Sequence, residues 1–318
     1  MGKIYITDCD HANINEETEV FTKAGIEFEL VQCKTEDDVI AKCKDAVAVC
    51  NQYAPLTKKV FEAIPTLKTV VRYGVGVDNV DVKGATELGV KVCNVPDYGT
   101  FEVADQALAL MMDITRKVSK ADALVKGGVW DYAKCAPITR LSTVTVGIVG
   151  LGRIGCAFAK RVHSLGCKVI GYDVYTAHVK SDPELSFIET VSLDDVLANA
   201  DIISLHCGLN QDNAKMMNKA TFAKMKKGSM LINVARGGLV NEEDLAEALQ
   251  SGQLAAAGID VTCHEPLEMD SPLRKAPNIT ITPHMAWYSV EAASDLKRKC
   301  AEEAVRGFKG ETLRCPVN

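Results

Sequence analysis

Residues 143–173 read TVTVGIVGLGRIGCAFAKRVHSLGCKVIGYD, and the assignment of this chain's fold rests on them. The apolar run Thr143–Val149 indicates a buried strand, and a glycine-rich hexamer follows it directly at 150–155. The next residues place apolar side chains at helical spacing up to Gly166: Ile154, Ala157, Phe158, Val162 and Leu165. A second apolar run, Lys168–Tyr172, follows. Strand, glycine turn, helix and strand in this order predict a dinucleotide-binding βαβ unit.

Each glycine of the hexamer has its own task in such a unit. Gly150 permits the tight turn after the strand, and Gly155 lets the helix pack closely against the strand. Gly152 lets backbone N–H groups approach a pyrophosphate. The start of the helix, with Arg153 and Ile154 in its first turn, then faces the anion.

The carboxylate of Asp173 predicts which nicotinamide cofactor binds. Asp173 ends the second strand, 18 residues after Gly155, where a carboxylate can accept hydrogen bonds from the adenosine ribose. It would also repel a 2′-phosphate, and the next Lys or Arg along the chain is Lys180. We therefore expect NAD rather than NADP. The alternative is a glycine turn with an unrelated aspartate.

Short β-branched runs alternate with amphipathic helical patterns along the whole chain. This alternation predicts an α/β protein with parallel sheets covered on both faces. The runs form one group before about residue 95 and another after about residue 143, which predicts two doubly wound domains. The expected strands are Lys3–Thr7, Phe28–Gln32, Ala46–Cys50, Lys68–Arg72, Val90–Cys93, Thr143–Val149, Lys168–Tyr172, Asp201–Leu205, Ser229–Val234, Ala257–Val261 and Asn278–Thr282.

The segment between the two groups of strands is predicted to begin as a helix. Thr100–Val118 has apolar residues at three- and four-residue spacing, and Thr100 is the expected N-cap. The irregular residues 127–140 follow and carry Trp130. They form either a connection between subunits or domains, or a surface loop with one packed tryptophan.

Composition and charge exclude several classes of protein. A length of 318 residues suggests two domains, and 47% hydrophobic residues suffice for ordinary cores. The net charge of −6 predicts no nucleic-acid partner. No apolar run approaches the roughly 18 residues of a membrane span, and the first residues lack a signal-peptide pattern. The 12 cysteines contain no Cys-x-x-Cys pair, so we expect no metal site and a cytoplasmic protein.

Three polar residues follow expected strands of the second group, at the sheet edge where ligands bind in such folds. They are Arg236, Glu265 and His284. An arginine suits a carboxylate with an adjacent carbonyl oxygen, and a glutamate paired with a histidine favours the imidazolium, which can donate a proton to a ketone. Taken singly, Arg236 could equally form a surface ion pair, and Glu265 could be a solvated loop carboxylate.

Spacing alone leaves the identity of the proton donor open. His206 also ends an expected strand, and His264 is adjacent to Glu265, so both compete with His284. The other three histidines are expected to be surface or structural residues: His11, His163 and His178.

Together these motifs resemble the D-isomer-specific 2-hydroxyacid dehydrogenases, and the resemblance covers nearly the whole chain. The motifs are VRYGVGVDNVD at 71–81, NVP at 94–96, GLGRIG at 150–155, NVARGG at 233–238, Asp260-Val261 with Glu265-Pro266, and Pro283-His284.

The resemblance implies both a catalytic set and a domain arrangement. His284 would be the acid and base, Glu265 would orient it, and Arg236 would bind the substrate carboxylate and carbonyl. A Rossmann NAD-binding domain, residues 101–287, would be inserted into a flavodoxin-like substrate domain made of residues 1–100 and 288–318. The active site would then be the cleft between the domains, with backbone N–H groups around Val75 and Gly76 facing the substrate carboxylate.

Within the family, residues 206–213 and 284–289 are most similar to the C-terminal-binding proteins, animal corepressors that keep the dehydrogenase site. The family motifs imply further cofactor contacts, made by Cys207, Asn210, Val234, Ala235 and Asp260. Trp287 would lie near the substrate side chain, where it favours a sizeable apolar group, or would pack the domain hinge. Thr262-Cys263-His264 and Met285 depart from the family pattern and leave the substrate preference open.

The resemblance favours an enzyme, an NAD-dependent oxidoreductase that interconverts a 2-oxo acid and a D-2-hydroxy acid. One alternative is a D-3-phosphoglycerate dehydrogenase, with Arg72 or Lys83 as the contact for the extra phosphate. Another is an NAD-gated, corepressor-like binding module, although the chain ends at Asn318 without the corepressors' long tail or a regulatory domain. The family further implies a homodimer that forms through Thr100–Lys117 and the loop after it.

Overall fold

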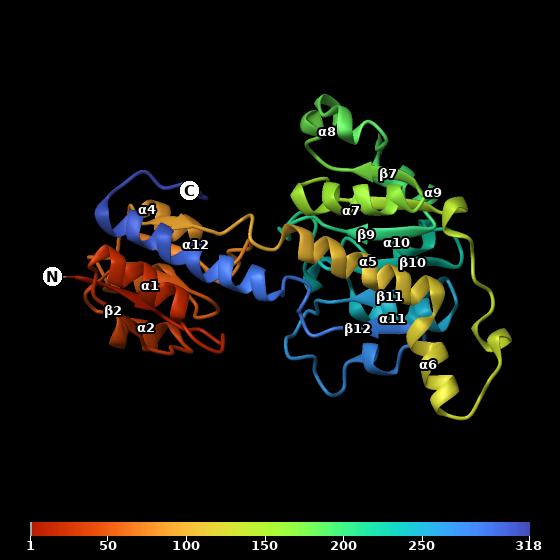
Figure 1. The fold of residues 1–318 in the computed structure, drawn as a ribbon, viewed down its shortest axis with the longest axis horizontal. Helices are drawn as coiled ribbons and strands as arrows, with labels where there is room; N and C mark the ends of the chain where they lie inside the picture. Colours follow the sequence, from red (N-terminus) through yellow and green to blue (C-terminus); the bar gives the residue numbers. More distant parts are fainter. Residues whose placement is uncertain (1) are drawn as a thin grey trace. The chain divides into compact units, whose positions relative to one another are not determined.

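The computed structural model describes residues 2–318, which divide into two compact units (Figure 1). Unit 1 comprises the residues up to Gly99 together with Ser289–Asn318, and unit 2 comprises Thr100–Tyr288. The boundaries expected from the sequence differ from these by one residue at each crossing. No helix within residues 2–318 is long and apolar enough to cross a bilayer.

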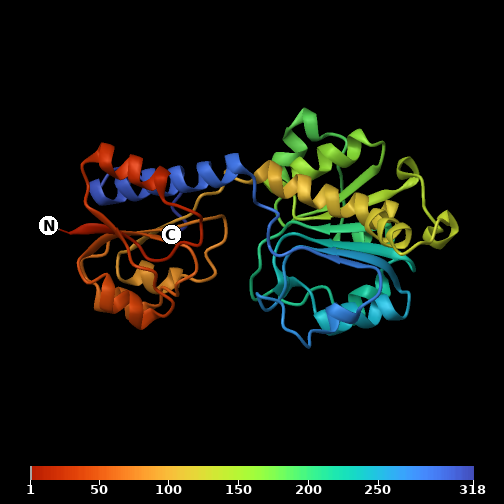
Figure 2. The ribbon, with the colours of Figure 1, turned by 60° about the horizontal axis from the view of Figure 1, so that its bottom comes forward.

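Unit 1 is built around a five-stranded parallel sheet with strand order β2-β1-β3-β4-β5. Helices α1 and α12 lie on one face of this sheet, and α2, α3 and α4 lie on the other (Figure 2). The elements are β1 (Lys3–Ile6), α1 (Asn15–Ala24), β2 (Phe28–Leu30), α2 (Glu36–Lys42), β3 (Ala46–Asn51), α3 (Lys58–Ala63), β4 (Thr69–Arg72), α4 (Val82–Glu87), β5 (Lys91–Cys93) and α12 (Val290–Lys309).

Unit 2 is built around a seven-stranded parallel sheet with strand order β12-β11-β10-β9-β6-β7-β8. Its elements are α5 (Thr100–Arg116), α6 (Val118–Lys126), β6 (Thr145–Val149), α7 (Arg153–Ser164), β7 (Lys168–Tyr172), α8 (Ala177–Ser181), β8 (Glu189–Thr190), α9 (Leu193–Asn199), β9 (Ile202–Leu205), α10 (Lys219–Lys224), β10 (Ser229–Asn233), α11 (Glu242–Gln250), β11 (Leu254–Ile259) and β12 (Ile279–Ile281). Single 3₁₀ turns occur at Tyr132–Cys135, Leu141–Thr143, Pro183–Leu185, Gly237–Leu239 and Pro272–Lys275. The predicted fold class, α/β with two doubly wound parallel sheets, is confirmed.

The core of unit 2 has two layers, one on each face of the sheet. Helices α5 and α7 pack on one face, with Phe158 and Met111 among the fully buried side chains. Helices α9, α10 and α11 pack on the other, with Phe222 and Leu197 buried. Because both faces are covered, the strands carry apolar residues without alternation. The polar residues of interest therefore lie at the strand ends and in the loops after them.

The strand order of unit 2 contains one point where the direction of the connections reverses. In unit 2 the chain proceeds from β6 outward through β7 to β8, then returns to β9 beside β6 and proceeds outward the other way. Loops that leave neighbouring strands in opposite directions open a space beyond their carboxyl ends, where ligands bind in doubly wound folds. The glycine hexamer follows β6 and His206 follows β9, so both lie at this point.

The structure corrects two local predictions. The predicted helix 100–118 is two helices, because Lys117 adopts a left-handed conformation with φ of 56° and separates α5 from α6. Thr100 is the first residue of α5 rather than its predicted N-cap. The short strand β8 was not predicted, because its two residues, Glu189 and Thr190, carry no apolar run.

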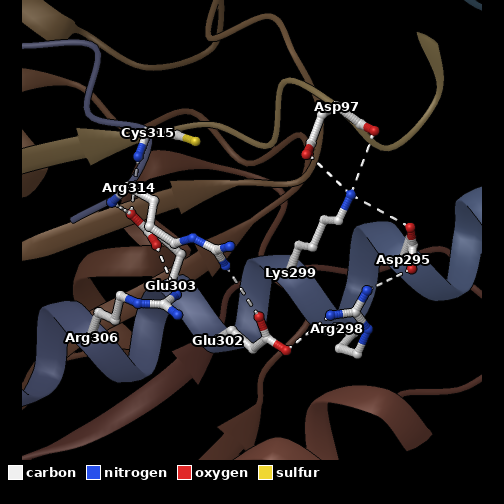
Figure 3. A network of polar contacts seen from close by, with 9 residues as sticks. All are labelled: Asp97, Asp295, Arg298, Lys299, Glu302, Glu303, Arg306, Arg314 and Cys315. Carbon is white, nitrogen blue, oxygen red and sulfur yellow. Dashed lines mark hydrogen bonds and ion pairs between the residues drawn. The ribbon is translucent and has the colours of Figure 1, made fainter.

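A polar network on α12 secures the end of the chain to unit 1 (Figure 3). The buried Glu303 carboxylate accepts hydrogen bonds from the Arg314 N–H at 2.6 Å and the Cys315 N–H at 3.3 Å, and pairs with Arg306 at 3.2 Å. Lys299 Nζ lies 3.1 Å from Asp97. The last residues then bond to β5, where the Val317 N–H donates to the Val92 carbonyl at 2.8 Å.

Candidate active site

The glycine hexamer forms a tight turn between β6 and α7. Gly150 has φ of +98°, and a Cβ there would lie 2.5 Å from the backbone nitrogen of Cys207. A Cβ on Gly155 would overlap the Gly150 carbonyl oxygen, so this glycine lets the first turn of α7 approach the loop. Nothing lies within 4 Å of the Cβ position of Gly152, which precedes α7. Arg153 and Ile154, the first two residues of α7, follow at this open side.

Asp173 lies beside the glycine turn, directly after β7. Its Oδ2 accepts a hydrogen bond from the Leu151 N–H at 2.6 Å, and its Oδ1 accepts one from the Tyr175 N–H at 3.0 Å. The carboxylate is therefore held at the turn. Each oxygen has a second lone pair that can accept a hydroxyl hydrogen.

The other residues expected at the cofactor occupy loops after β9, β10 and β11. Cys207 is half-buried, and burial raises the pKa of its thiol to about 11. The Asn210 side chain is exposed and its Oδ1 accepts from the Asp212 N–H at 2.9 Å, so it shapes its own loop. Val234 is buried, and Ala235 is half-buried at the end of β10.

His284 and Glu265 form a hydrogen-bonded pair. His284 Nδ1 lies 2.6 Å from Glu265 Oε2, and both side chains keep nearly two fifths of their surface exposed. Burial alone would raise the pKa of Glu265, but the hydrogen bond and charge of His284, the Thr262 N–H and the charge of Arg236 outweigh it and lower the pKa. The glutamate is thus a carboxylate near neutral pH, and it holds the imidazole with Nε2 facing away from the pair.

Arg236 lies in the turn after β10, and the residue after it must be a glycine, Gly237. A Cβ on Gly237 would overlap the backbone of Thr262, so the Arg236–Gly237 turn packs directly against the loop that carries Glu265. Asn233 Nδ2 donates to the Arg236 carbonyl at 2.9 Å and holds the turn. The half-buried guanidinium donates to the Ala235 carbonyl at 2.8 Å and lowers the pKa of Glu265. A guanidinium beside a carboxylate–imidazole pair can bind an anion next to a proton donor.

Asp260 has a role that the sequence analysis missed. This buried carboxylate follows β11 and accepts hydrogen bonds from the backbone N–H groups of Met285 at 3.1 Å and Ala286 at 2.9 Å, and from the Thr282 hydroxyl at 2.5 Å. Its backbone carbonyl accepts from the His284 N–H at 2.7 Å. Asp260 therefore holds the loop that carries His284, whose φ of 51° is left-handed. The signal that could have revealed this role is an acidic residue directly after a buried strand.

The two competing histidines lie in other environments. Burial lowers the pKa of His206 to about 3, and its Nδ1 is buried without a hydrogen-bond partner within residues 2–318, while Nε2 lies 2.8 Å from the Ser204 hydroxyl. His206 is thus a neutral, structural imidazole that packs on Phe158 at 5.1 Å. His264 is exposed, and its backbone carbonyl accepts from Thr262.

The expected substrate contacts lie on separate elements. In unit 1, Val75 and Gly76 belong to the turn after β4, and Asn94 Nδ2 donates to the Val75 carbonyl at 2.7 Å. Gly74 in the same turn has φ of +134°, and a Cβ there would overlap the guanidinium of Arg72. In unit 2, Trp287 is half-buried and lies edge-on to a neighbouring tyrosine at 5.6 Å.

No group of three His, Cys, Asp or Glu side chains among residues 2–318 is placed to hold a metal ion. The polar groups that the structure brings together here are the Arg236 guanidinium, the Glu265 carboxylate and the His284 imidazole. These three follow β10, β11 and β12, and the glycine turn follows β6 of the same sheet.

Comparison with known proteins identifies relatives of this chain. Residues 108–286 match the family model described as "D-isomer specific 2-hydroxyacid dehydrogenase, NAD binding domain". This range contains the glycine turn, Asp173, Arg236, Glu265 and His284.

Two curated proteins and one solved structure illustrate the similarity. The chain is 36% identical over 291 residues to a hydroxypyruvate reductase from Blautia hydrogenotrophica, covering 89% of this chain and 87% of that protein. It is 37% identical over 310 residues to "D-3-phosphoglycerate dehydrogenase 2, chloroplastic" from Arabidopsis thaliana, covering 95% of this chain and 49% of that protein. The chain spans about half the length of the curated phosphoglycerate dehydrogenases it matches. A glyoxylate reductase structure from Paecilomyes thermophila matches with a TM-score of 0.89 and 27% identity, covering 100% of this chain and 98% of that chain.

Proposed function

We propose, because the chain belongs to the D-isomer-specific 2-hydroxyacid dehydrogenases, that it reversibly reduces a 2-oxo acid to a D-2-hydroxy acid with NAD as cofactor. The observation that carries the proposal is the 2.6 Å hydrogen bond between His284 Nδ1 and Glu265 Oε2, with the Arg236 turn packed against the same loop. A proton donor, the carboxylate that orients it and a cation for the substrate are the groups this reaction needs.

Each of the three residues has one task in the proposed mechanism. The Arg236 guanidinium binds the substrate carboxylate and polarises the adjacent carbonyl oxygen. His284 donates the proton on Nε2 to that oxygen as the carbonyl carbon accepts a hydride, and takes it back in the reverse direction. Glu265 accepts from Nδ1 and stabilises the imidazolium that must precede donation. The bound nicotinamide supplies or accepts the hydride.

The residues of unit 2 fit an NAD molecule. The open side of Gly152 and the first turn of α7, with Arg153 and Ile154, suit a pyrophosphate. The carboxylate of Asp173 lies beside this turn, where it suits the ribose hydroxyls and repels a 2′-phosphate. Cys207, Asn210, Val234, Ala235 and Asp260 occupy the loops after the neighbouring strands and complete the proposed cofactor site.

Unit 1 is the proposed substrate domain. Its contribution is the turn after β4, where the backbone N–H groups of Val75 and Gly76 would bind the substrate carboxylate. Trp287 of unit 2 is proposed to contact the substrate side chain and to favour a sizeable apolar group.

A phosphorylated substrate is a second candidate, because several curated relatives are named D-3-phosphoglycerate dehydrogenase. The extra phosphate needs a cation, and Arg72 lies at the end of β4 with its guanidinium against Gly74 of the same turn. Lys83, exposed on α4, is the other candidate. Replacing Arg72 with Met should raise KM for 3-phosphohydroxypyruvate about tenfold or more and leave KM for hydroxypyruvate nearly unchanged if this candidate is correct.

The experiment that tests the proposal is NADH oxidation by the purified protein with a panel of 2-oxo acids. The panel contains glyoxylate, pyruvate, hydroxypyruvate, 3-phosphohydroxypyruvate, 4-methylthio-2-oxobutyrate and phenylpyruvate. Preference for one of them identifies the substrate class and tests the role of Trp287. Tight NADH binding without turnover of any of them would instead favour an NAD-gated binding module, which a pull-down with and without NADH would then examine.

We also propose a cytoplasmic homodimer. None of the 12 cysteines forms a disulfide, which fits a reducing compartment. The segment after α6 carries Trp130 and Tyr132 with 90% and 91% of their surfaces exposed, and a second copy of the chain would cover them together with α5. Sedimentation velocity should give twice the monomer mass, and Trp130→Ala should weaken association. A monomer at micromolar concentration contradicts the proposal.

A further inference from the structure

The carbonyl group of Leu151, inside the glycine turn, accepts hydrogen bonds from two side chains. His178 Nε2 lies 2.6 Å from the Leu151 oxygen, and because that oxygen can only accept, Nε2 must carry a proton. Cys156 Sγ lies 3.0 Å from the same oxygen, and burial raises the pKa of this thiol, so it remains a donor. The Leu151 N–H is held by Asp173 at 2.6 Å. Both peptide groups that flank Leu151 are therefore fixed by side chains.

His178 is itself held in place. It lies on α8, the short helix that follows β7 (Figure 1), and the next residue, Val179, is buried in the apolar cluster that also contains Leu151. The ring of Tyr175 stacks on the His178 ring, with centroids 5.8 Å apart and planes 18° apart. The buried Val179 and the stacked Tyr175 ring thus fix the position and the orientation of the imidazole relative to the glycine turn.

The hydrogen bond from His178 also orients the N–H of Gly152, because the Leu151 carbonyl and the Gly152 N–H belong to the same peptide group. The group is planar and trans, so its carbonyl and its N–H point in opposite directions. A carbonyl directed at His178 leaves the Gly152 N–H directed the other way, and this N–H has no acceptor within residues 2–318. Gly152 also has open space at its Cβ position. The Gly152 N–H, which can donate a hydrogen bond to a pyrophosphate, is therefore already oriented in the protein without a ligand.

We propose that His178 is a positioning residue for the phosphate-binding turn, and that it raises the affinity of this chain for pyrophosphate-containing nucleotides. The inference rests on the proposed NAD site. The aromatic ring and the hydrogen bond of His178 have separable effects. The ring supports Tyr175 beside Asp173, whereas the hydrogen bond acts only through the Leu151–Gly152 peptide group.

The test compares three ligands on four proteins. Dissociation constants for NADH, ADP-ribose and adenosine are measured by calorimetry on the wild type, His178→Phe, His178→Gln and Tyr175→Leu. The phenylalanine variant keeps the ring and loses the donor, while the glutamine variant keeps a donor without the ring. Tyr175→Leu is the matched control, because it removes the stacking and leaves the hydrogen bond.

We expect His178→Phe to weaken NADH and ADP-ribose binding roughly three- to tenfold, the usual contribution of one hydrogen bond, and to leave adenosine unchanged within about twofold. His178→Gln should recover most of the loss, and kcat at saturating NADH should stay near that of the wild type. If the phenylalanine variant does not fold, His178→Ala replaces it; because alanine removes the ring as well as the donor, its loss of affinity is compared with that of Tyr175→Leu, which removes the stacking alone.

Three outcomes overturn the inference. They are NADH binding by His178→Phe equal to that of the wild type, a loss for adenosine as large as that for NADH, and no recovery in His178→Gln. Failure of the wild type to bind NADH has a different meaning, because it overturns the proposed function itself.

Discussion

Three histidines after parallel strands of unit 2 illustrate how surroundings determine the chemistry of one residue type. His284 pairs with Glu265 and keeps part of its surface exposed, which suits a group that exchanges protons with a substrate. His206 occupies a similar position after β9, but burial lowers its pKa to about 3 and leaves it neutral at pH 7. His264 is exposed, and no ion pair holds its ring within the described residues.

Replacing His284 with Ala should therefore lower kcat by roughly two to four decades, the usual contribution of a general acid. NADH affinity should change little, because the imidazole acts on the substrate. Steady-state NADH oxidation and NADH fluorescence titration measure the two quantities. His264→Ala is the control and should keep full activity. Undiminished turnover in the His284 variant would remove this residue from the mechanism.

His206 predicts a pH dependence of stability. The folded state resists protonation down to about pH 3, whereas the unfolded chain binds a proton near pH 6.5. The unfolded state therefore binds more protons between these values, so the free energy of unfolding falls as the pH falls below 6.5. From pH 6.5 to pH 5 the loss due to His206 alone is about 2 kcal/mol.

Urea denaturation at the two pH values checks this dependence. His206→Gln should flatten the decline, and His264→Gln, an exposed site, should leave it as in the wild type. An equally steep decline in the His206 variant would contradict the buried, neutral state of this imidazole.

At the scale of elements, the sequence predicts strands and the loops after them better than it predicts what those loops contact. The run Thr143–Val149 and the glycine hexamer indicate β6 and its turn because burial on both faces demands a continuous apolar run. Helix α8 has five residues and one buried side chain, Val179, so it has no readable periodicity. The hydrogen bond from His178 to Leu151 joins residues 27 positions apart, and local pattern carries no information on such pairs.

The same limit applies to helix α12 and its buried acid. The sequence analysis assigned no element to Val290–Lys309, and only the structure shows that Glu303 on this helix accepts hydrogen bonds from the N–H groups of Arg314 and Cys315. Glu303→Gln should lower the free energy of unfolding by about 1–3 kcal/mol, because it weakens charge-assisted bonds at a buried site. Chemical denaturation measures the change. The neighbouring Glu302→Gln, on a surface pair, should cost less than about 1 kcal/mol, and equal costs would show that burial of Glu303 is not the cause.

At the scale of the whole molecule, a cofactor that binds only to unit 2 should stabilise unit 2 against unfolding more than unit 1. NADH at 100 times its dissociation constant should stabilise unit 2 by about 2.7 kcal/mol, and differential scanning calorimetry should show the upward shift of its transition. NADPH at the same concentration should shift it much less, because Asp173 faces the position of the 2′-phosphate in the proposed site. An equal shift with both cofactors would contradict the preference for NAD.

The division of unit 1 into two chain segments has a consequence for biosynthesis. Unit 2 is continuous, so all of it has left the ribosome once Tyr288 has cleared the exit tunnel. Unit 1 must wait for α12, which packs against β3 and β4 and is translated after unit 2. Until then one face of its sheet has α1 but lacks α12, and the nascent chain exposes an apolar surface of the kind that chaperones bind. A premature stop codon at the start of α12 would thus damage the unit whose first segment is translated before unit 2.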